Sequence, residues 1–458
     1  MTILDVSIVN VALPSIKVSL GVSDKSLQWV LTAYAITFGG LLLLAGRSAD
    51  LLGRRRMFMI GVALFSGASL VCGLAGSIGV LVAARAVQGV GAAIVSAATL
   101  SIITTTFEEG TERNKALGIW GAMGGSGAAA GVLFGGILTK YAGWEWIFFV
   151  NVPVGAIVFA LTRPIVRESR ISGLRGFDAG GAATVTSSIA LLVYAISKAP
   201  DVGWGSARTI GLLLASAALL AAFAVIESRI GSPMVPFQIF RTKTLAGANV
   251  TGVFLGAVVY ANFFILTLYA QQVLHYSALK TGLTFLATAG TVIPVAGISQ
   301  ALTTRFGPRP VLTIGLALIT AAMLVYAQIP THGSFAANLL PGYLLMGVGM
   351  AFAFIPMSIA ALAGVAPQEA GLASGLINTS QQIGGALGVA ISSTVAFTHV
   401  RTLLASHHSP AVALTSGFAL AFWVLAGVSA VSVVAAFALV RSREVTEPAE
   451  AYSSPGLA

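Results

Sequence analysis

Two charged residues stand out because they lie inside apolar segments of the chain. Asp5 is the one acidic residue, of 15, that falls within an apolar run, and Arg85 is the one basic residue well inside another. A lone charge in hydrocarbon costs roughly 3 kcal/mol or more, so both side chains are expected to face a wet interior, where they can meet. A buried carboxylate beside a guanidinium can bind and release a proton. The alternatives are a solvated, inert Asp5 near the start of the chain and an Arg85 that only pins backbone carbonyls.

A second group of charges lies between two apolar runs, in the segment GRSADLLGRRR that starts at Gly46. Small residues such as Gly46 and Gly53 suit a tight turn between two spanning helices, and the arginines hold that turn on the cytoplasmic face. The one acid, Asp50, can pair with Arg54 or Arg55 and with the end of a neighbouring helix. This pattern predicts a gate that is latched when the inner face is shut. A turn that only sets topology is the alternative.

The composition indicates which solvent surrounds these residues. Hydrophobic residues make up 57% of the 458 positions and charged residues only 9%, which leaves too little polar surface to coat a soluble protein of this size. The chain is therefore expected to be an integral membrane protein. Its net charge of +10 does not indicate nucleic acid, because the basic residues stand singly between apolar runs and form no stripe with aromatic residues.

Apolar runs of about 20 residues, the length that crosses a bilayer core, predict an all-α protein with fourteen spans. An even number puts both termini on one side, and placing them in the cytoplasm leaves most basic residues inside as well. No signal peptide and no lipidation motif are expected, and the first span is barely long enough to cross. The candidate spans are 1–19, 27–46, 57–77, 79–105, 114–138, 146–166, 178–198, 208–228, 245–270, 281–302, 310–329, 336–363, 370–398 and 411–440.

Three segments recur eight spans apart, which indicates a duplicated architecture. The segment VQGVGAA at 87–93 is echoed by LMGVGMA at 345–351, and GRR at 53–55 by GPR at 307–309; the glycine-rich fifth span pairs with the thirteenth. Duplicated halves with a site at their interface are a transporter plan. The predicted domains are a six-helix bundle, two inserted helices, a second six-helix bundle and a disordered cytoplasmic tail, at 1–170, 171–244, 245–440 and 441–458.

These segments resemble the signatures of the major facilitator superfamily, in the right order and over nearly the whole chain. The resemblance implies the major facilitator fold and, more narrowly, the fourteen-span drug:proton antiporters of the EmrB/QacA-like group. In that group Asp5 and Arg85 would couple transport to protons, and the Asp50 latch would stabilise the outward-facing state. The matching segments are LDVSIVNVALP at 4–14, GRSADLLGRRR at 46–56, LVAARAVQGVGAA at 81–93 and WEWIFFVNVPVG at 144–155.

The fifth predicted span resembles the antiporter motif of this family. Glycines at i, i+4 and i+8 lie on one helix face and allow another backbone to approach closely. We expect this face to form a dry contact between the two halves that prevents leakage while they rock, with plain helix packing as the alternative. One departure from the motif is Val132, where the family usually has proline. The motif glycines are Gly118, Gly127, Gly131, Gly135 and Gly136.

A substrate cavity needs aromatic faces and a few amides, and amides avoid lipid. The last six predicted spans contain no acidic residue, so the expected substrates are hydrophobic and neutral or monocationic, because a dication would require a second buried carboxylate. For the aromatic residues, ordinary packing is the alternative. The candidate cavity residues are Tyr34, Gln88, Asn151, Asn262, Phe264, Tyr269, Asn378 and Gln381.

Other chemistry has little support in the sequence. The five histidines fall in or beside external connections, Cys72 is alone, and no Walker lysine pattern or nucleophile elbow is present, so neither an enzyme nor a metal or cofactor site is expected. The sequence predicts a monomeric transporter of the bacterial inner membrane that uses the proton gradient to export hydrophobic or cationic small molecules. A dedicated exporter of one metabolite or antibiotic, and a receptor or scaffold that transports nothing, are the alternatives.

Overall fold

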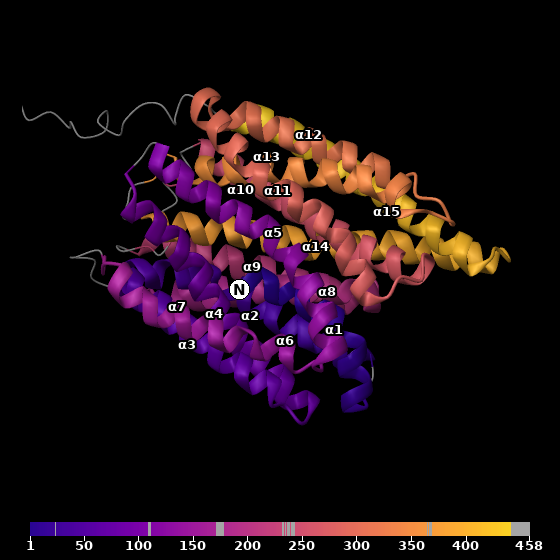
Figure 1. Ribbon diagram of the computed structural model, residues 1–458. Coiled ribbons are helices and arrows are strands. Elements are labelled where there is room, and N and C mark those ends of the chain that lie inside the picture. Colours follow the sequence, from indigo (N-terminus) through magenta and orange to yellow (C-terminus); the bar gives the residue numbers. More distant parts are fainter. Residues whose placement is uncertain are drawn as a thin grey trace, which may run out of the picture.

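The computed structural model describes residues 1–440 except 23, 109–110, 171–177, 231–232, 234, 236–238, 240–242, 364 and 366–368; the predicted tail lies outside the described residues. All secondary-structure elements in the described part are helices (Figure 1). The helices are α1 (Thr2–Leu20), α2 (Asp24–Leu52), α3 (Arg54–Gly73), α4 (Ile78–Thr106), α5 (Thr111–Tyr141), α6 (Trp146–Phe149), α7 (Asn151–Ile165), α8 (Ala179–Val202), α9 (Ala207–Arg229), α10 (Lys243–Leu268), α11 (Ala278–Phe306), α12 (Pro308–Tyr326), α13 (Leu340–Leu362), α14 (Ala370–Ala405) and α15 (Pro410–Leu439), with short π-helices η2 (Tyr269–Val273) and η3 (Phe335–Leu339).

Serine side chains and left-handed glycines set many of the helix boundaries. Ser77, Ser206 and Ser409 each accept a hydrogen bond from the backbone N–H three residues later, which satisfies a donor that the first turn leaves free. Gly53 separates α2 from α3 at a φ of 106°, a backbone conformation that residues with a Cβ rarely adopt. The end of the bundle that carries this turn is called the arginine-rich end below.

Twelve helices in the described residues are long and apolar enough to cross a membrane. The prediction of a multi-pass all-helical protein is therefore confirmed in its general form, but the count of fourteen is not supported. The helices α1 and α5 make the difference. The apolar part of α1, Thr2–Leu13, is shorter than a full span, and α5 is not among the twelve.

The helices pack as two groups that meet along two seams. The N-terminal helices α1–α7 pack mainly on one another, except α5, whose most extensive contact is with α11, and the C-terminal helices α10–α15 also pack mainly on one another. The groups touch where α2 and α4 pack on α14 and where α5 packs on α11 and α13; in Figure 1 the purple α5 lies beside the pink α11. The two groups are thus joined along two separate lines of contact.

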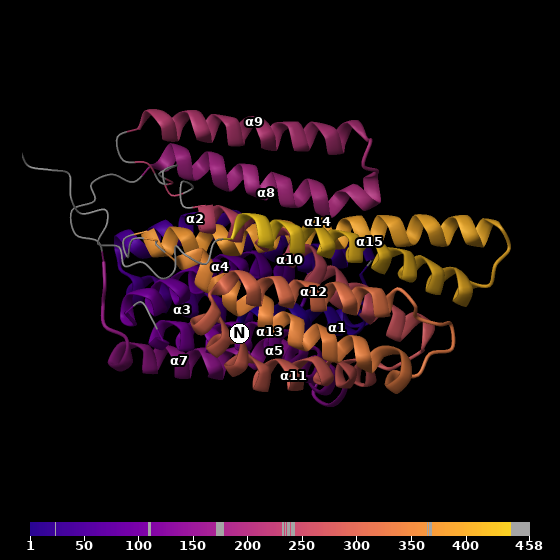
Figure 2. The same cartoon turned by 90° about the horizontal axis from the view of Figure 1, so that it is seen from above.

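Helices α8 and α9 form a separate layer on one side of the molecule (Figure 2). α8 packs on both α2 and α14 and so lies over the seam between the two groups, whereas the main contact of α9 in the described part is with α8. Ser188 and Ser216 join the two helices by reciprocal hydrogen bonds, each hydroxyl donating to the other residue's carbonyl at 2.8 Å. At the far end from the arginine-rich turn, Trp204 Nε1 donates to Thr394 Oγ1 of α14 at 2.9 Å.

Glycines allow the closest helix contacts in the bundle. On α14, Gly371 and Gly375 face α2 of the other group, whereas Gly384 and Gly388 face α10 within the same group. Such close approach of backbones is the usual way in which helices associate tightly in lipid. The first glycines of α14 therefore form contacts between the two groups, and its later glycines form contacts within the C-terminal group.

Replacing Gly384 with alanine is expected to destabilise the protein. A Cβ at this position would overlap the carbonyl oxygen of Val253 on α10, and overpacking of this kind costs about 1–3 kcal/mol. Thermal unfolding in detergent measures the effect. The matched control is Gly427→Ala on α15, where a Cβ meets no atom within 4 Å; equal melting temperatures for the two variants would contradict the assignment.

Candidate functional site

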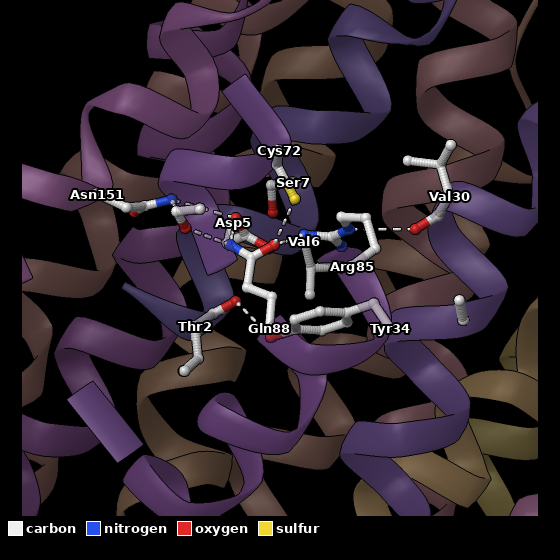
Figure 3. Close-up of polar contacts among 12 residues, drawn as sticks. Thr2, Asp5, Val6, Ser7, Val30, Tyr34, Cys72, Arg85, Gln88 and Asn151 are labelled. Atoms are coloured by element: carbon white, nitrogen blue, oxygen red, sulfur yellow. Dashed lines mark hydrogen bonds and ion pairs between the residues drawn. The ribbon is translucent and has the colours of Figure 1, made fainter. Parts of the chain in front are cut away.

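Asp5 and Arg85 form an ion pair inside the N-terminal helices (Figure 3). Asp5 lies in the first turn of α1 and Arg85 near the start of α4. Both side chains are 0% exposed, and Arg85 Nη1 lies 2.5 Å from Asp5 Oδ2. The predicted meeting of the two charges is confirmed, and the alternative of a solvated Asp5 is wrong. Their role in proton coupling stays a prediction.

Two amide side chains complete the hydrogen bonding of the Asp5 carboxylate. Gln88 Nε2 and Asn151 Nδ2 both donate to Asp5 Oδ1, at 2.8 and 3.2 Å. The same two amide nitrogens donate to the hydroxyl of Ser69, at 2.6 and 3.4 Å. α1, α3, α4 and α7 thus each contribute one or more side chains to a closed polar cluster, which we call the Asp5 cluster.

The guanidinium of Arg85 is held by further contacts besides Asp5. Its Nε donates to the Val30 carbonyl at 3.1 Å and its Nη1 to Gln88 Oε1 at 2.6 Å. The ring of Tyr34 lies under the guanidinium, 4.2 Å from its central carbon, as expected for a cation–π contact. Within the described residues Nη2 has no hydrogen-bond partner. Arg85 therefore binds a backbone carbonyl and also pairs with Asp5, so the structural role that was the alternative for Arg85 is present together with the ion pair.

The Asp5 cluster is shut off from solvent in this conformation. Gln88 is 0% exposed, Asn151 2% and Tyr34 3%. The carboxylate of Asp5 keeps a guanidinium and two amides as hydrogen-bond partners. A proton can reach it only if some of these partners move, so the geometry suits a carboxylate that exchanges its proton during a conformational cycle.

The gate residues lie where α2, α3 and α14 meet. Asp50 Oδ1 accepts hydrogen bonds from Arg54 Nη2 at 2.7 Å and from Ser101 Oγ at 3.2 Å. Its other oxygen, Oδ2, has no hydrogen-bond partner among the described residues and points at the first turn of α14, where a Cβ on Gly371 would come within 2.5 Å of it. The carboxylate thus faces a helix N-terminus of the other group, where a negative charge is favourable.

A second acid closes the turn between α2 and α3. The carboxylate of Glu168 accepts hydrogen bonds from the backbone N–H groups of Arg55 and Arg56, at 3.2 Å each, and its Oε2 lies 3.7 Å from Arg55 Nε. A Cβ on Gly53 would lie 2.7 Å from the same carboxylate. Glycine is therefore favoured at this turn for two reasons: it can adopt the positive φ, and it leaves room for the carboxylate of Glu168.

Arg47 connects several segments at the arginine-rich end. Its Nη2 donates to the carbonyl of Pro233, in the connection after α9, at 3.4 Å. Glu369 lies directly before α14; partial burial raises the pKa of its carboxyl, and the positive charge of Arg47 opposes that shift. Arg47 therefore acts on both the inserted helices and the C-terminal group.

Three of the five antiporter-motif glycines lie elsewhere than expected. Gly127, Gly131 and Gly135 face α1, and a Cβ on Gly131 would come within 2.5 Å of the Leu4 carbonyl oxygen. The expectation that they form the contact between the two groups is wrong, because α1 and α5 belong to the same group. The period of four residues predicted a close-packed face correctly, but it carries no information about which helix that face meets.

The contact of α5 with the C-terminal group uses another glycine of the motif, Gly118, and the backbone at Val132. A Cβ on Gly118 would touch Gln300 of α11, and Gly282 of α11 packs against the backbone at Val132. Gly136 is buried. The place where proline was missing from the motif, Val132, is thus a point of close contact between the groups.

The candidate cavity residues are distributed over several places. Tyr34, Gln88 and Asn151 surround the Asp5 cluster in this conformation, as described above. Asn378 accepts a hydrogen bond from Ser96 of the other group at 3.2 Å, and the hydroxyl of Tyr269 donates to the Pro330 carbonyl at 2.6 Å. Asn262 and Gln381 are buried, each with one amide atom lacking a partner in the described part, and Phe264 is half-buried. Substrate contact stays a prediction for all eight.

Sequence reasoning missed three residues that the structure brings to these sites. Ser69 belongs to the Asp5 cluster, Ser101 to the Asp50 pair and Glu168 to the α2–α3 turn. Serines are common in membrane helices, so Ser69 and Ser101 give no signal on their own. Glu168 comes 113 positions after the residue it binds, and only the fold relates the two.

Comparison with known proteins connects this geometry to a family. The family model described as Major Facilitator Superfamily matches residues 1–389. Puromycin resistance protein pur8 of Streptomyces alboniger is 38% identical over 99% of this chain and 91% of its own length. Multidrug resistance protein Stp of Mycobacterium tuberculosis is 36% identical over 90% of this chain and 76% of its own length.

A solved structure supports the fold independently. The human organic anion transporter MFSD10 (TETRAN) superposes with a TM-score of 0.66 at 15% sequence identity, over 95% of this chain and 96% of that one. At this identity the likeness concerns the arrangement of helices alone.

Proposed function

Because this chain belongs to the major facilitator superfamily of membrane transporters, we propose that it is a proton-coupled antiporter. It exports hydrophobic or monocationic drugs across the bacterial inner membrane by alternating access. Two of its relatives carry drug-resistance names, puromycin resistance protein and multidrug resistance protein, which supports small toxic molecules as substrates.

The observation that carries the proposal is the buried pair of Asp5 and Arg85. Burying an ion pair costs free energy that well-packed apolar residues would not cost. Such a pair in a membrane helix bundle is the expected sign of a proton pathway. Asp5 carries the proton in exchange for substrate, and Arg85 is its counter-charge.

Alternating access follows from where the two helix groups touch. Asp50 faces the first turn of α14, and Gly46 packs against the same turn, so this end is closed. We infer that these contacts open and re-form as the groups rock, with the latch favouring the outward-facing state.

The remaining topology belongs to the same proposal. The chain has fourteen spans, with α1 and α5 added to the twelve, and is a member of the EmrB/QacA-like group with both termini in the cytoplasm. The domains are two bundles, 1–170 and 245–440, with the inserted helices in 171–244. The protein works as a monomer and is driven by the proton gradient without a bound cofactor.

A dedicated exporter of one antibiotic is the second candidate. It is favoured by the name of pur8, which refers to a single compound, whereas the name of Stp favours many. A resistance screen across chemically unrelated toxins separates them, because a dedicated exporter protects against only one compound class. A receptor or scaffold would bind compounds without moving them.

Purified protein in liposomes tests the proposal. With an acidic lumen, a cationic dye and puromycin are expected to enter against their gradients, and each addition of substrate should release protons from the lumen. A protonophore should abolish both effects. Uptake that ignores the imposed pH gradient would rule out antiport, and binding without flux would favour the receptor.

A further inference from the structure

Gln88 occupies a special position, because it contacts both members of the ion pair. Its Nε2 donates to Asp5 Oδ1 at 2.8 Å, and its Oε1 accepts from Arg85 Nη1 at 2.6 Å (Figure 3). The thiol of Cys72 also points at Oε1, at 3.8 Å. The orientation of the amide is thus set on one side by an acceptor and on the other by donors.

In the described part of the chain, every side-chain atom that hydrogen-bonds the Asp5 carboxylate is a donor. Arg85 Nη1 binds Oδ2, and the amide nitrogens of Gln88 and Asn151 bind Oδ1. These groups suit the ionised carboxylate. A protonated carboxyl carries an O–H that itself needs an acceptor, and a buried donor without one is costly. The present arrangement therefore has no place for the proton.

Three other titratable groups of the described residues lie near Asp5. They are the phenol of Tyr34 on α2, the thiol of Cys72 on α3 and the amino group of Met1. The phenol donates to the Thr2 carbonyl at 3.5 Å, and the thiol is directed at Gln88. Neither of them is hydrogen-bonded to the Asp5 carboxylate, whereas the two amides are, so an amide that turns over would bring its own oxygen to the new proton.

Turning over the Gln88 amide has a consequence that turning over Asn151 lacks. Its oxygen would then accept from Asp5, but its nitrogen would face Arg85, so two donors would oppose each other. Arg85 would lose its bond to Gln88 at the moment when it also loses the negative charge of Asp5. Besides Oδ2 of the now neutral acid, its remaining contacts would be the Val30 carbonyl and the rings of Tyr34 and Phe148.

We propose that Gln88 links the protonation of Asp5 to the release of Arg85 through a turnover of its side-chain amide. The inference rests on the proposed proton exchange at Asp5. A proton from water forms an O–H bond on the Asp5 carboxylate, only hydrogen bonds rearrange elsewhere, and loss of the proton restores the original state. Gln88 is thus a positioning residue, and its contact with substrate is not required.

Infrared difference spectroscopy on acidification tests the turnover without any transport assay. The wild type should show a carboxylic acid band and a side-chain amide band together. Asp5→Asn should lose both, whereas Gln88→Met should keep the acid band and retain of the amide band only the contribution of Asn151, which also donates to Asp5. The matched control is Gln328→Met, at an exposed amide in the turn after α12, which should keep both bands.

The possible failures are distinguishable. An acid band that persists in Asp5→Asn would overturn proton exchange at Asp5 and the inference with it. An acid band that depends on Asp5, combined with an amide band that is unchanged in Gln88→Met, would overturn the turnover alone.

A transport assay gives a second test, because a purely structural role of Gln88 would not uncouple proton release from substrate exchange. Gln88→Met loses both hydrogen bonds of the link, so the number of protons released per substrate exchanged should fall about tenfold or more. In Gln88→Glu the new carboxylate can accept hydrogen bonds from Arg85 and from the protonated Asp5 at the same time. Arg85 would then stay bound, so this variant should also uncouple proton release from substrate exchange. Parallel loss of proton release and substrate exchange in both variants would contradict the proposal.

Discussion

Asp5→Asn is expected to abolish substrate-driven proton release from liposomes while leaving substrate exchange measurable. Asparagine has nearly the shape of aspartate but cannot bind the proton that the cycle exchanges. Proton release is followed with a pH-sensitive dye in the lumen, and substrate exchange with labelled compound at equal pH on both sides. The control is Asp201→Asn, the same change at a side chain that is 48% exposed and pairs with Lys198.

The same variant is expected to be less stable, for a separate reason. It leaves the fully buried charge of Arg85 without its counter-ion, and breaking a buried pair in this way costs about 3–5 kcal/mol. The double variant Asp5→Asn/Arg85→Gln removes both charges, so its melting temperature should recover while proton release stays absent. Normal proton release in Asp5→Asn would remove this carboxylate from the mechanism, and recovery of release in the double variant would do the same.

The pairing of Asp5 with Arg85 could be predicted because the physics leaves few choices. The two residues are 80 positions apart, yet each is a charge in an apolar helix, and mutual neutralisation is the least costly way to keep both. The turn around Asp50 was predictable on similar grounds. Charged residues are rare in this chain, so each one carries information about its surroundings.

The amides were harder to place. Gln88 and Asn151 were assigned to a substrate cavity because amides avoid lipid, and that reasoning is correct as far as it goes. It does not distinguish an amide that faces substrate from one that faces another side chain. In this conformation both are bonded to Asp5, and only the spatial relation of α1, α4 and α7 could reveal it.

Glycine patterns show the same limit. Gly131 and Gly135 predicted a close helix neighbour from their spacing, and they have one, but it is α1 rather than the opposite group. Spacing along one helix defines a face and contains nothing about the partner. The contacts between the groups instead depend on glycines that stand opposite backbone carbonyls, such as Gly46 and Gly371, whose pairing only the fold reveals.

Gly46→Ala is expected to disfavour the arrangement that is closed at the arginine-rich end. A Cβ on Gly46 of α2 would overlap the carbonyl oxygen of Gly371 on α14. The overlap exists only while the two groups are in contact, so the cost of about 1–3 kcal/mol applies to the closed state alone. A state-specific cost of this size shifts the equilibrium by about 5- to 150-fold. The closed state would thus lose most of its population.

Distance measurements between spin labels can follow this shift. Labels on Arg56→Cys and Phe306→Cys, in a Cys72→Ala background, report the separation of the two groups at that end, since both positions are exposed and lie on opposite groups. Gly46→Ala should move the distribution to longer distances and slow transport. Gly67→Ala, where a Cβ meets nothing within 4 Å, should leave both unchanged. An unaltered distribution in Gly46→Ala would mean that this contact does not decide which side is open, and the gate would then have to rest on Asp50 and its partners.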